Sequence, residues 1–290
     1  MAIHNLGSIN IDHVYSVPHL PGAGETLASS ERTTGLGGKG ANQSIAAAKA
    51  GAEVWHLGAV GADGAWCVEE LAAAGVKTDF VATLAVPTGH AIINVDEAGE
   101  NSIVLYEGAN RALEPTTFNP AIEQFSSGDW LLFQNETNLA GFMTRMATAS
   151  GLKVAYAAAP FSAEAVSDVL EKIDLLAVNE IEAAQLAETL GVALCQLPVR
   201  NLLVTKGAAG AEFREGDDVI EVPAFPVAPV DTTGAGDTFL GYFLAGLDRG
   251  VSTKEALLLA SGAAALQVTK PGAADAIPEL TEVQAFLRTM

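Results

Sequence analysis

A carboxylate beside a glycine-rich turn could support phosphoryl-transfer chemistry near the C-terminus. The segment from Asp231 to Phe239 reads Asp-Thr-Thr-Gly-Ala-Gly-Asp-Thr-Phe and leads into an apolar helical pattern. Gly234 and Gly236 have no Cβ, so main-chain N–H groups can approach a phosphate closely, and the helix start adds unpaired donors. Asp237 lies where it could take a proton from an attacking hydroxyl. A simpler alternative is that this aspartate only caps the helix.

A second glycine cluster favours the catalytic interpretation. The segment from Gly35 to Gln43 reads Gly-Leu-Gly-Gly-Lys-Gly-Ala-Asn-Gln and contains the G-x-G-x-x-G spacing of dinucleotide-binding turns. That motif needs a buried strand directly before it, whereas residues 29–34 are polar. A Walker A loop is also excluded, because Thr33 stands in place of its first glycine and Gly40 in place of its Ser or Thr. A nucleotide must therefore be held in another way.

The composition is typical of an α/β protein with an acidic surface. Hydrophobic residues make up 49% of the 290 residues and aromatic residues only 6%, which suits parallel strands buried under helices. No apolar run reaches the about 18 residues of a membrane span and no signal peptide is evident, so we expect a cytoplasmic protein. The net charge of −20 disfavours nucleic-acid and membrane partners.

Apolar runs and helical patterns alternate along most of the chain. This alternation predicts one α/β domain over residues 1–290, a three-layer α/β/α sandwich with a mostly parallel central sheet. The expected strands are 2–11, 53–60, 130–134, 154–158, 175–178 and 202–205. The expected helices are 41–50, 65–74, 139–150, 163–173, 180–190, 238–248, 254–268 and 282–287.

Two segments interrupt this alternation and predict a small β lid. Residues 90–95 and 102–106, joined by a polar turn, have the pattern of a β-hairpin. The non-helical segment 12–34 could pair with it, so the lid would comprise about residues 12–34 and 88–108. Such a sheet can cover a site or form a subunit interface, and its exposed edges favour a homodimer.

The two glycine motifs, in this order, resemble the two signatures of the ribokinase-like (PfkB) family of sugar kinases, and the likeness covers nearly the whole chain. Shorter motifs also follow in the family's order: Asn10 to His13, Pro21 to Thr26, Gly99 to Asn101, Gly108 to Asn110, Phe133 to Glu136, Asn179 to Glu182 and Val204 to Gly207. The resemblance implies ATP-dependent phosphorylation of the primary hydroxyl of a sugar, with ribose as the expected acceptor.

The resemblance also assigns residues to the sugar and to the chemistry. Amides and carboxylates can pair with sugar hydroxyls both as donors and as acceptors. The expected sugar-binding residues are Asn10, Asp12, Gly38, Lys39, Asn42, Glu136 and Asp237. Asp237 would act as general base, and the turn formed by Gly234, Ala235 and Gly236 would form the anion hole. Taken alone, Asn10 and Asp12 could be turn formers and Glu136 a loop charge.

The nucleotide and its ions are expected next to this turn. The resemblance implies that Asn179, Thr205, Lys206 and Gly207 bind ATP and that Glu182 holds Mg²⁺ through water, although N-x-x-E is also a capping-box pattern. It further implies a monovalent cation, usually K⁺, near Asp231, Thr233, Gln267, Lys270 and Gly272. Ala276 departs from the family, which commonly has a serine hydroxyl near this ion.

The acceptor stays open at the level of sequence. The strand end Ala157 to Pro160 differs from the Asn-Pro-Ala-Pro common in ribokinase-like proteins, and the segment 190–201 is short for the usual helix. A kinase for a nucleoside, fructose or another sugar is one alternative. A sugar-binding regulator without catalysis is another, and we expect no binding of NAD.

Overall fold

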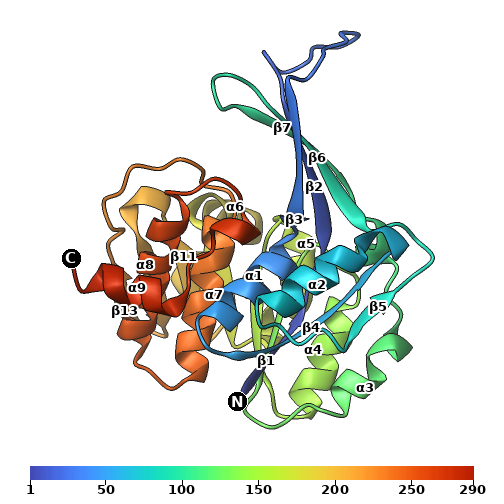
Figure 1. Ribbon diagram of the computed structural model, residues 1–290. Coiled ribbons are helices and arrows are strands. Elements are labelled where there is room, and N and C mark those ends of the chain that lie inside the picture. Colours follow the sequence, from blue (N-terminus) through green and yellow to red (C-terminus); the bar gives the residue numbers. More distant parts are fainter.

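A nine-stranded sheet forms the centre of the computed structural model, which describes all residues, 1–290 (Figure 1). Its strands are Ala2–Leu6 (β1), Glu53–Val60 (β4), Val81–Thr83 (β5), Trp130–Gln134 (β8), Lys153–Ala157 (β9), Leu175–Asn179 (β10), Asn201–Thr205 (β11), Ala211–Glu215 (β12) and Asp218–Val222 (β13). The order is β13-β12-β11-β10-β9-β8-β1-β4-β5. Pairing is parallel from β11 to β5 and antiparallel between β11, β12 and β13.

Helices cover both faces of this sheet, which confirms the predicted three-layer α/β/α fold. One layer contains Lys39–Lys49 (α1), Ala65–Ala73 (α2), Ala235–Asp248 (α7), Thr253–Gln267 (α8) and Leu280–Leu287 (α9). The other contains Asn119–Ile122 (α3), Ala140–Ala149 (α4), Ala163–Val169 (α5) and Glu180–Leu190 (α6). Along β8, Trp130 and Leu132 pack against the first layer and Leu131 and Phe133 against the second, because successive side chains point to opposite faces.

One prediction about this sheet was wrong, and two of its strands were not predicted. The expected strand 2–11 is interrupted, since β1 ends at Leu6 and residues from Asn10 onward belong to a second sheet. The antiparallel strands β12 and β13 were not predicted, because each is a short mixture of charged and apolar residues without the continuous apolar run of the inner strands. No helix carries an apolar stretch of membrane-spanning length.

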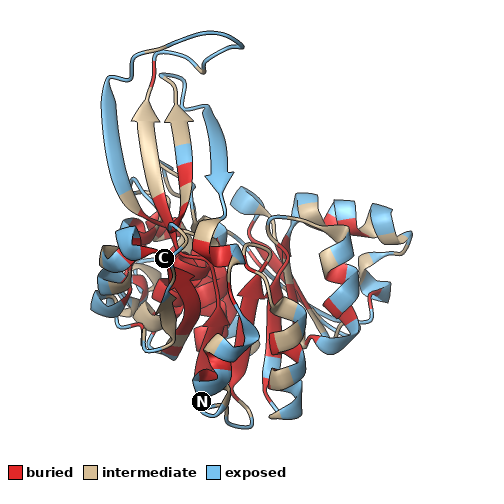
Figure 2. Ribbon diagram, turned by 90° about the vertical axis from the view of Figure 1, so that its right-hand side faces the viewer, coloured by how far each residue is buried: buried red, intermediate tan, exposed pale blue.

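The second sheet has four strands and protrudes from the molecule (Figure 2). It contains Glu31–Gly37 (β3), Asn10–Ser16 (β2), Gly89–Val95 (β6) and Asn101–Tyr106 (β7), in that order. The expected hairpin is present as β6 and β7, and β2 pairs with β6 in parallel. The outer strand β7 is exposed along its whole length, whereas β2 is buried where it begins.

Close glycine contacts bring the starts of α1 and α7 together. A Cβ on Gly241 of α7 would lie 2.5 Å from Cβ of Ala46 and 2.8 Å from the carbonyl oxygen of Gln43, both on α1. A Cβ on Gly40 would lie 2.3 Å from Cα of Gly7, in the turn that follows β1. The two glycine-rich segments predicted to do chemistry therefore meet beside the carboxyl end of β1, the edge where open α/β sheets bind ligands.

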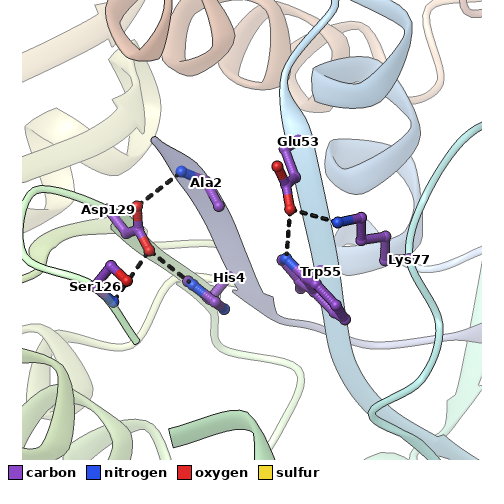
Figure 3. A network of polar contacts seen from close by, with 7 residues as sticks. All are labelled: Ala2, His4, Glu53, Trp55, Lys77, Ser126 and Asp129. Atoms are coloured by element: carbon purple, nitrogen blue, oxygen red, sulfur yellow. Dashed lines mark hydrogen bonds and ion pairs between the residues drawn. The ribbon is translucent and has the colours of Figure 1, made fainter. Parts of the chain in front are cut away.

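A different polar cluster joins the amino ends of β1 and β8 (Figure 3). The Asp129 carboxylate accepts hydrogen bonds from the main-chain N–H groups of Ala2 (2.9 Å) and Ser126 (3.2 Å) and lies 3.2 Å from Nε2 of His4. None of the expected site residues belongs to this cluster.

Candidate active site

The two glycine motifs meet at the carboxylate of Asp237. Asp237 is buried in the first turn of α7. The helix begins after Gly234, whose φ of 74° is left-handed and suits glycine. Oδ1 of Asp237 accepts a hydrogen bond from Nε2 of Gln43 at 2.7 Å, and its Oδ2 lies 3.4 Å from Nδ2 of Asn42. At Gly236 a Cβ would meet no atom within 4 Å, so open space adjoins the helix start. This arrangement gives an oriented carboxylate beside the unpaired N–H groups of Gly236 and Asp237, whereas the N–H of Ala235 donates to the carbonyl of Thr232 at 3.2 Å.

Glu136 ties the chain after β8 to the start of α1. Its Oε2 accepts hydrogen bonds from the hydroxyl of Ser8 and from the main-chain N–H of Lys39, the latter at 3.0 Å. Burial raises the pKa of Glu136, and the hydrogen bonds from Ser8 and Lys39 offset this only in part. Glu136 is thus a positioned carboxylate and not a mobile loop charge.

The first residues of β2 line the same region. Asn10 is buried, and its Oδ1 accepts a hydrogen bond from Nδ2 of Asn110 at 2.8 Å. The carboxylate of Asp12 lies over Gly37, where a Cβ would be only 2.0 Å from Oδ2 of Asp12. Burial, with a contribution from Glu136, raises the pKa of Asp12 to about 6. Gly38, with φ 95°, precedes α1 and turns the chain into the helix.

Lys39 supplies positive charge among several carboxylates. The Asp237 carboxylate raises the pKa of Lys39, with smaller contributions from Glu136 and Glu182, against the opposing effect of burial. The ammonium group is therefore held in its charged form beside the carboxylates expected to bind sugar, metal and proton. In a chain with a net charge of −20, it provides a local positive charge for an anionic ligand.

A cavity adjoins this cluster at Glu136. It has a volume of about 390 Å³ and is lined by Glu136 and its neighbour Asn135, by Leu105 of β7, and by Phe161 and other residues that lead into α5. The lining combines the polar groups of Asn135 and Glu136 with the apolar side chains of Leu105 and Phe161. This combination suits a small polar ligand with one apolar face.

The N-x-x-E motif forms a capping box at the start of α6. Oδ1 of Asn179 accepts hydrogen bonds from the N–H groups of Ile181 and Glu182, and Oε2 of Glu182 accepts one from the N–H of Asn179 at 2.8 Å. Burial raises the pKa of Glu182, and the Asn179 hydrogen bond and Lys39 offset part of the effect. Capping does not separate Glu182 from the site, because it interacts electrostatically with Lys39 and Asp237.

The other expected nucleotide residues lie on the turn after β11. Thr205 ends that strand, and Gly207 follows with a left-handed φ of 53°. The ammonium of Lys206 is 2.7 Å from Glu212 and 3.3 Å from Glu221, on β12 and β13. These residues form no hydrogen bond with the Asp237 cluster, so the turn is a separate part of the expected site.

The residues expected to hold a monovalent ion form a linked pair of loops. Oδ1 of Asp231 accepts from the N–H of Thr233 and Oδ2 from the N–H of Gly272, each at 2.9 Å. Burial would raise the pKa of Asp231, but these hydrogen bonds outweigh it and the net shift is downward. Nε2 of Gln267 donates to the carbonyl of Thr233 at 2.9 Å, and its buried Oε1 has no partner. The side-chain ammonium of Lys270 lies 3.5 Å from Glu282, which leaves its main-chain carbonyl as the group expected to bind the ion.

Sequence reasoning did not single out four polar residues that support the site. Ser8 contacts Glu136, Asn110 contacts Asn10, and Gln43 and Gln134 form a hydrogen-bonded pair behind Asp237. All four are buried. The available signal was a polar side chain within an otherwise apolar or small-residue segment.

Comparison with known proteins agrees with this geometry. The model of the pfkB family carbohydrate kinases matches residues 3–280. A ribokinase of Haemophilus influenzae is 38% identical, over 97% of this chain and 97% of its own. A ribokinase of Bacillus subtilis is 35% identical, over 97% of this chain and 98% of its own. The structure of Arabidopsis thaliana ribokinase complexed with ribose and ATP has a TM-score of 0.87 and 30% identity, covering 99% of each chain.

These findings define the class of the protein, which is an enzyme of the kinase type built on a three-layer α/β fold. The family match spans most of the chain, and the similar proteins cover nearly all of it. The chain therefore belongs to the pfkB family of carbohydrate kinases.

Proposed function

We propose that this protein transfers the γ-phosphoryl group of ATP to the primary hydroxyl of ribose, giving ribose 5-phosphate and ADP. The observation that carries the proposal is the meeting of the two glycine-rich helix starts at the buried carboxylate of Asp237. The similarity to two ribokinases and to a ribokinase with ribose and ATP supports ribose as the acceptor.

In the proposed mechanism Asp237 acts as the general base. Its Oδ1 is occupied by Gln43, while the 3.4 Å contact of Oδ2 with Asn42 leaves Oδ2 accessible to a hydroxyl hydrogen. As the sugar oxygen forms its bond to the γ-phosphorus, Oδ2 takes the proton and the bond to the β-phosphate oxygen breaks. The N–H groups of Gly236 and Asp237 stabilise the negative charge on the transferred group, and the N–H of Ala235 joins them when it leaves the carbonyl of Thr232.

The sugar would be bound between β2, the start of α1 and Glu136. Asn42 is well suited to this role, since its buried Oδ1 has no partner within the protein and can accept a hydroxyl hydrogen. Asn10, Asp12 and Glu136 offer further acceptors, and Lys39 a charged donor. Gly38 leaves room for the sugar to approach the main chain.

ATP would extend from the anion hole toward Asn179 and the turn at Thr205, Lys206 and Gly207. Because Lys206 is paired with two carboxylates, this turn would bind ATP through main-chain groups more than through the charge of Lys206. Glu182 would hold Mg²⁺ through water, and the bound ion would supply positive charge that offsets the charge of the ATP phosphates. Oε2 of Glu182 is used in the capping box, which leaves Oε1 to accept a hydrogen bond from metal-bound water.

A monovalent cation fits the loop pair at Asp231 and Gln267. The carboxylate of Asp231 and the unpaired, buried Oε1 of Gln267 are both oxygen acceptors, the ligand type that K⁺ prefers. Main-chain carbonyls near Thr233, Lys270 and Gly272 would add ligands, whereas Ala276 provides no hydroxyl. We expect activity to rise when K⁺ replaces tetramethylammonium at constant ionic strength. Equal activity in the two salts would argue against this ion.

We further propose that the small sheet is a lid and a dimer interface. Its strand β7 exposes Ile103, Val104, Leu105 and Tyr106, an apolar stretch that a second subunit could cover. Leu105 also lines the cavity at Glu136, so closure of the sheet would reduce the access of water to the sugar. Light scattering during size-exclusion chromatography should show a dimer that Val104→Glu weakens.

A nucleoside is the second candidate acceptor. The apolar side chains of Leu105 and Phe161, which line the cavity, could contact a base attached to the ribose ring. With ribose alone, the side chains of Leu105 and Phe161 would contact water instead of the acceptor.

A panel of acceptors tests the proposal. We would measure ADP release with Mg·ATP and ribose, 2-deoxyribose, fructose or nucleosides, and identify the product by ³¹P NMR. The expected result is the highest kcat/KM with ribose and a phosphate on its primary hydroxyl. A preference for a nucleoside would select the second candidate, and no turnover of any acceptor would indicate a binding protein without catalysis.

A further inference from the structure

A chain of buried amides lies behind Asp237 and ends at its carboxylate. Gln43 donates from Nε2 to Oδ1 of Asp237 at 2.7 Å, and its Oε1 accepts from Nε2 of Gln134 at 2.7 Å. The second hydrogen of Gln134 Nε2 goes to Oδ1 of Asn5 at 3.0 Å. Asn5, Gln43 and Gln134 are at most 2% exposed. Three elements, β1, α1 and β8, therefore contribute one amide each to a path that leads to the expected base.

The orientation of each amide in this path is determined by the one before it. Nδ2 of Asn5 donates both hydrogens, to the carbonyl of Gly40 (2.9 Å) and to Oγ of Ser44 (2.8 Å). Because a carbonyl can only accept, the nitrogen of Asn5 must lie on that side and its Oδ1 must face Gln134. Gln134 then has to donate to both neighbours, and Gln43 has to accept from it. The remaining end of the Gln43 amide, its nitrogen, must face Asp237.

The far end of the network is also fixed and neutral. Nε2 of His56 lies 3.1 Å from the carbonyl of Gly7, so it must carry a hydrogen, and Nδ1 lies 2.8 Å from Oγ of Ser44. Burial lowers the pKa of His56 to about 4, so near neutral pH the ring is uncharged and its Nδ1 accepts from Ser44. Asp237 is thus the only charged member, and side-chain amides do not release protons near neutral pH. The network can orient the base but cannot carry its proton away.

We propose that Gln43 is the positioning residue of Asp237, holding Oδ1 so that Oδ2 is directed at the acceptor hydroxyl. The inference rests on the proposed role of Asp237 as general base. Gly241 supports it structurally, because the absence of its Cβ lets α7 approach the carbonyl of Gln43 on α1. If the Asp237 carboxylate were displaced, the sugar would still bind, but its hydroxyl would meet Oδ2 in a poorer geometry. The rate of the chemical step would then fall.

The test compares Gln43→Leu in two backgrounds. In the wild-type protein we expect kcat to fall by about 10- to 100-fold, with the KM for the sugar changed by less than about 2-fold. In the Asp237→Asn background the same substitution should cause no further fall, since the group that it positions has already lost its function. Equal proportional losses in both backgrounds would overturn the proposal. If Asp237→Asn alone kept the wild-type kcat, the proposed base would fail instead, which is a distinguishable result.

Gln43→Glu supplies a second readout if Gln43→Leu does not fold. The introduced carboxyl has the shape of the amide but can donate to Asp237 only when protonated. We expect the ratio of variant to wild-type kcat to rise as the pH is lowered from about 8 to about 6. A constant ratio would contradict the proposal. Thr144→Val, which removes a buried hydroxyl bonded only within α4, is the control and should leave kcat and its pH profile unchanged.

Discussion

The same two strands, β1 and β8, have a buried polar cluster at each end. The two clusters differ in whether a carboxylate oxygen stays available to a ligand. At the amino end, Asp129 receives donors from Ala2, His4 and Ser126 (Figure 3). At the carboxyl end, Asp237 receives a short hydrogen bond on one oxygen and a long contact on the other. A carboxylate whose partners are all internal stabilises the fold, whereas one with an accessible oxygen can also act on a ligand.

Neither of the two carboxylates is held by a strong ion pair. At the amino end a histidine faces the carboxylate, and burial lowers the pKa of His4 in spite of its hydrogen bond with Asp129. At the carboxyl end every residue bonded to Asp237 is a neutral amide, so its charge is not neutralised by a direct ion pair. Because only the cluster at the carboxyl end has an oxygen that a ligand can reach, substitutions at the two ends should separate effects on rate from effects on stability.

The largest effect is expected for Asp237→Asn. Loss of the general base should lower kcat with ribose by about 10²- to 10⁴-fold, while the KM for ribose changes little. The substitution keeps the shape of the side chain, so the thermal midpoint should stay near that of the wild type. Steady-state kinetics together with a thermal melt make the measurement, and a kcat close to wild type would remove Asp237 from the mechanism.

Acidification should destabilise the fold through His56. The ordinary pKa of 6.5 describes the unfolded chain and the folded value is about 4, so only the unfolded state gains a proton between these pH values. Stability is therefore complete above about pH 6.5 and declines as the pH falls to about 4, by about 3 kcal/mol in total. Urea unfolding across this range measures the slope, which His56→Gln should reduce. The same slope in both proteins would contradict the assignment.

Asp129→Asn should lower stability without lowering activity. It replaces an acceptor of three buried donors by an amide that can satisfy fewer of them, at an expected cost of about 1 to 3 kcal/mol in the free energy of unfolding. Because the cluster lies at the opposite end of the sheet, kcat should stay within about 2-fold of wild type. A large fall in kcat at a temperature where the variant is folded would contradict the claim that the cluster at the amino end affects stability alone.

Sugar binding should weaken as Asp12 is protonated. Its folded pKa of about 6 means that the carboxylate is lost as the pH falls below that value. The KM for ribose should rise about tenfold between about pH 7 and about pH 5, because the ionised fraction falls by about that factor. Asp12→Asn should have a high KM with little pH dependence over this interval. A wild-type KM that does not change would show that Asp12 does not bind the sugar as a carboxylate.

The smallest effect is expected at the surface pair Glu53 and Lys77. Lys77 contacts Glu53 and lies 4.3 Å from the ring centroid of Trp55, but both charged side chains are about half exposed (Figure 3). Lys77→Ala should change the free energy of unfolding by less than about 1 kcal/mol. Urea unfolding would measure it, and a larger loss would show that this edge of β4 matters more than its exposure indicates.

Much of the fold could be predicted because its signals are local. The strands 53–60 and 130–134 and the helix 180–190 have the predicted bounds, since each is a patterned run between clear turn or capping residues. The break between β1 and β2 was missed because Ile9 and Ile11 continue the apolar run across the turn at Gly7 and Ser8. That boundary depends on contact between Gly7 and Gly40, which are distant in sequence.

The site was predictable where a motif carries its own chemistry. The glycine turns, Asp237 and Glu136 lie together, because their positions follow from helix starts and strand ends, while their roles in binding and catalysis stay predictions. The amide path through Gln43 and Gln134 was not predicted, since it arises only when α1, β1 and β8 pack together. A buried glutamine in a strand gives no sign of the residue that it faces.

A crystal structure with ribose and a non-hydrolysable ATP analogue tests the central claim most directly. The account predicts the primary hydroxyl of ribose within about 2.6 to 3.2 Å of Oδ2 of Asp237, with Oδ1 still bonded to Gln43. It also predicts that the γ-phosphate lies against the N–H groups of Ala235 and Gly236. A ribose hydroxyl bound away from Asp237, or a carboxylate turned out of the pocket, would contradict it.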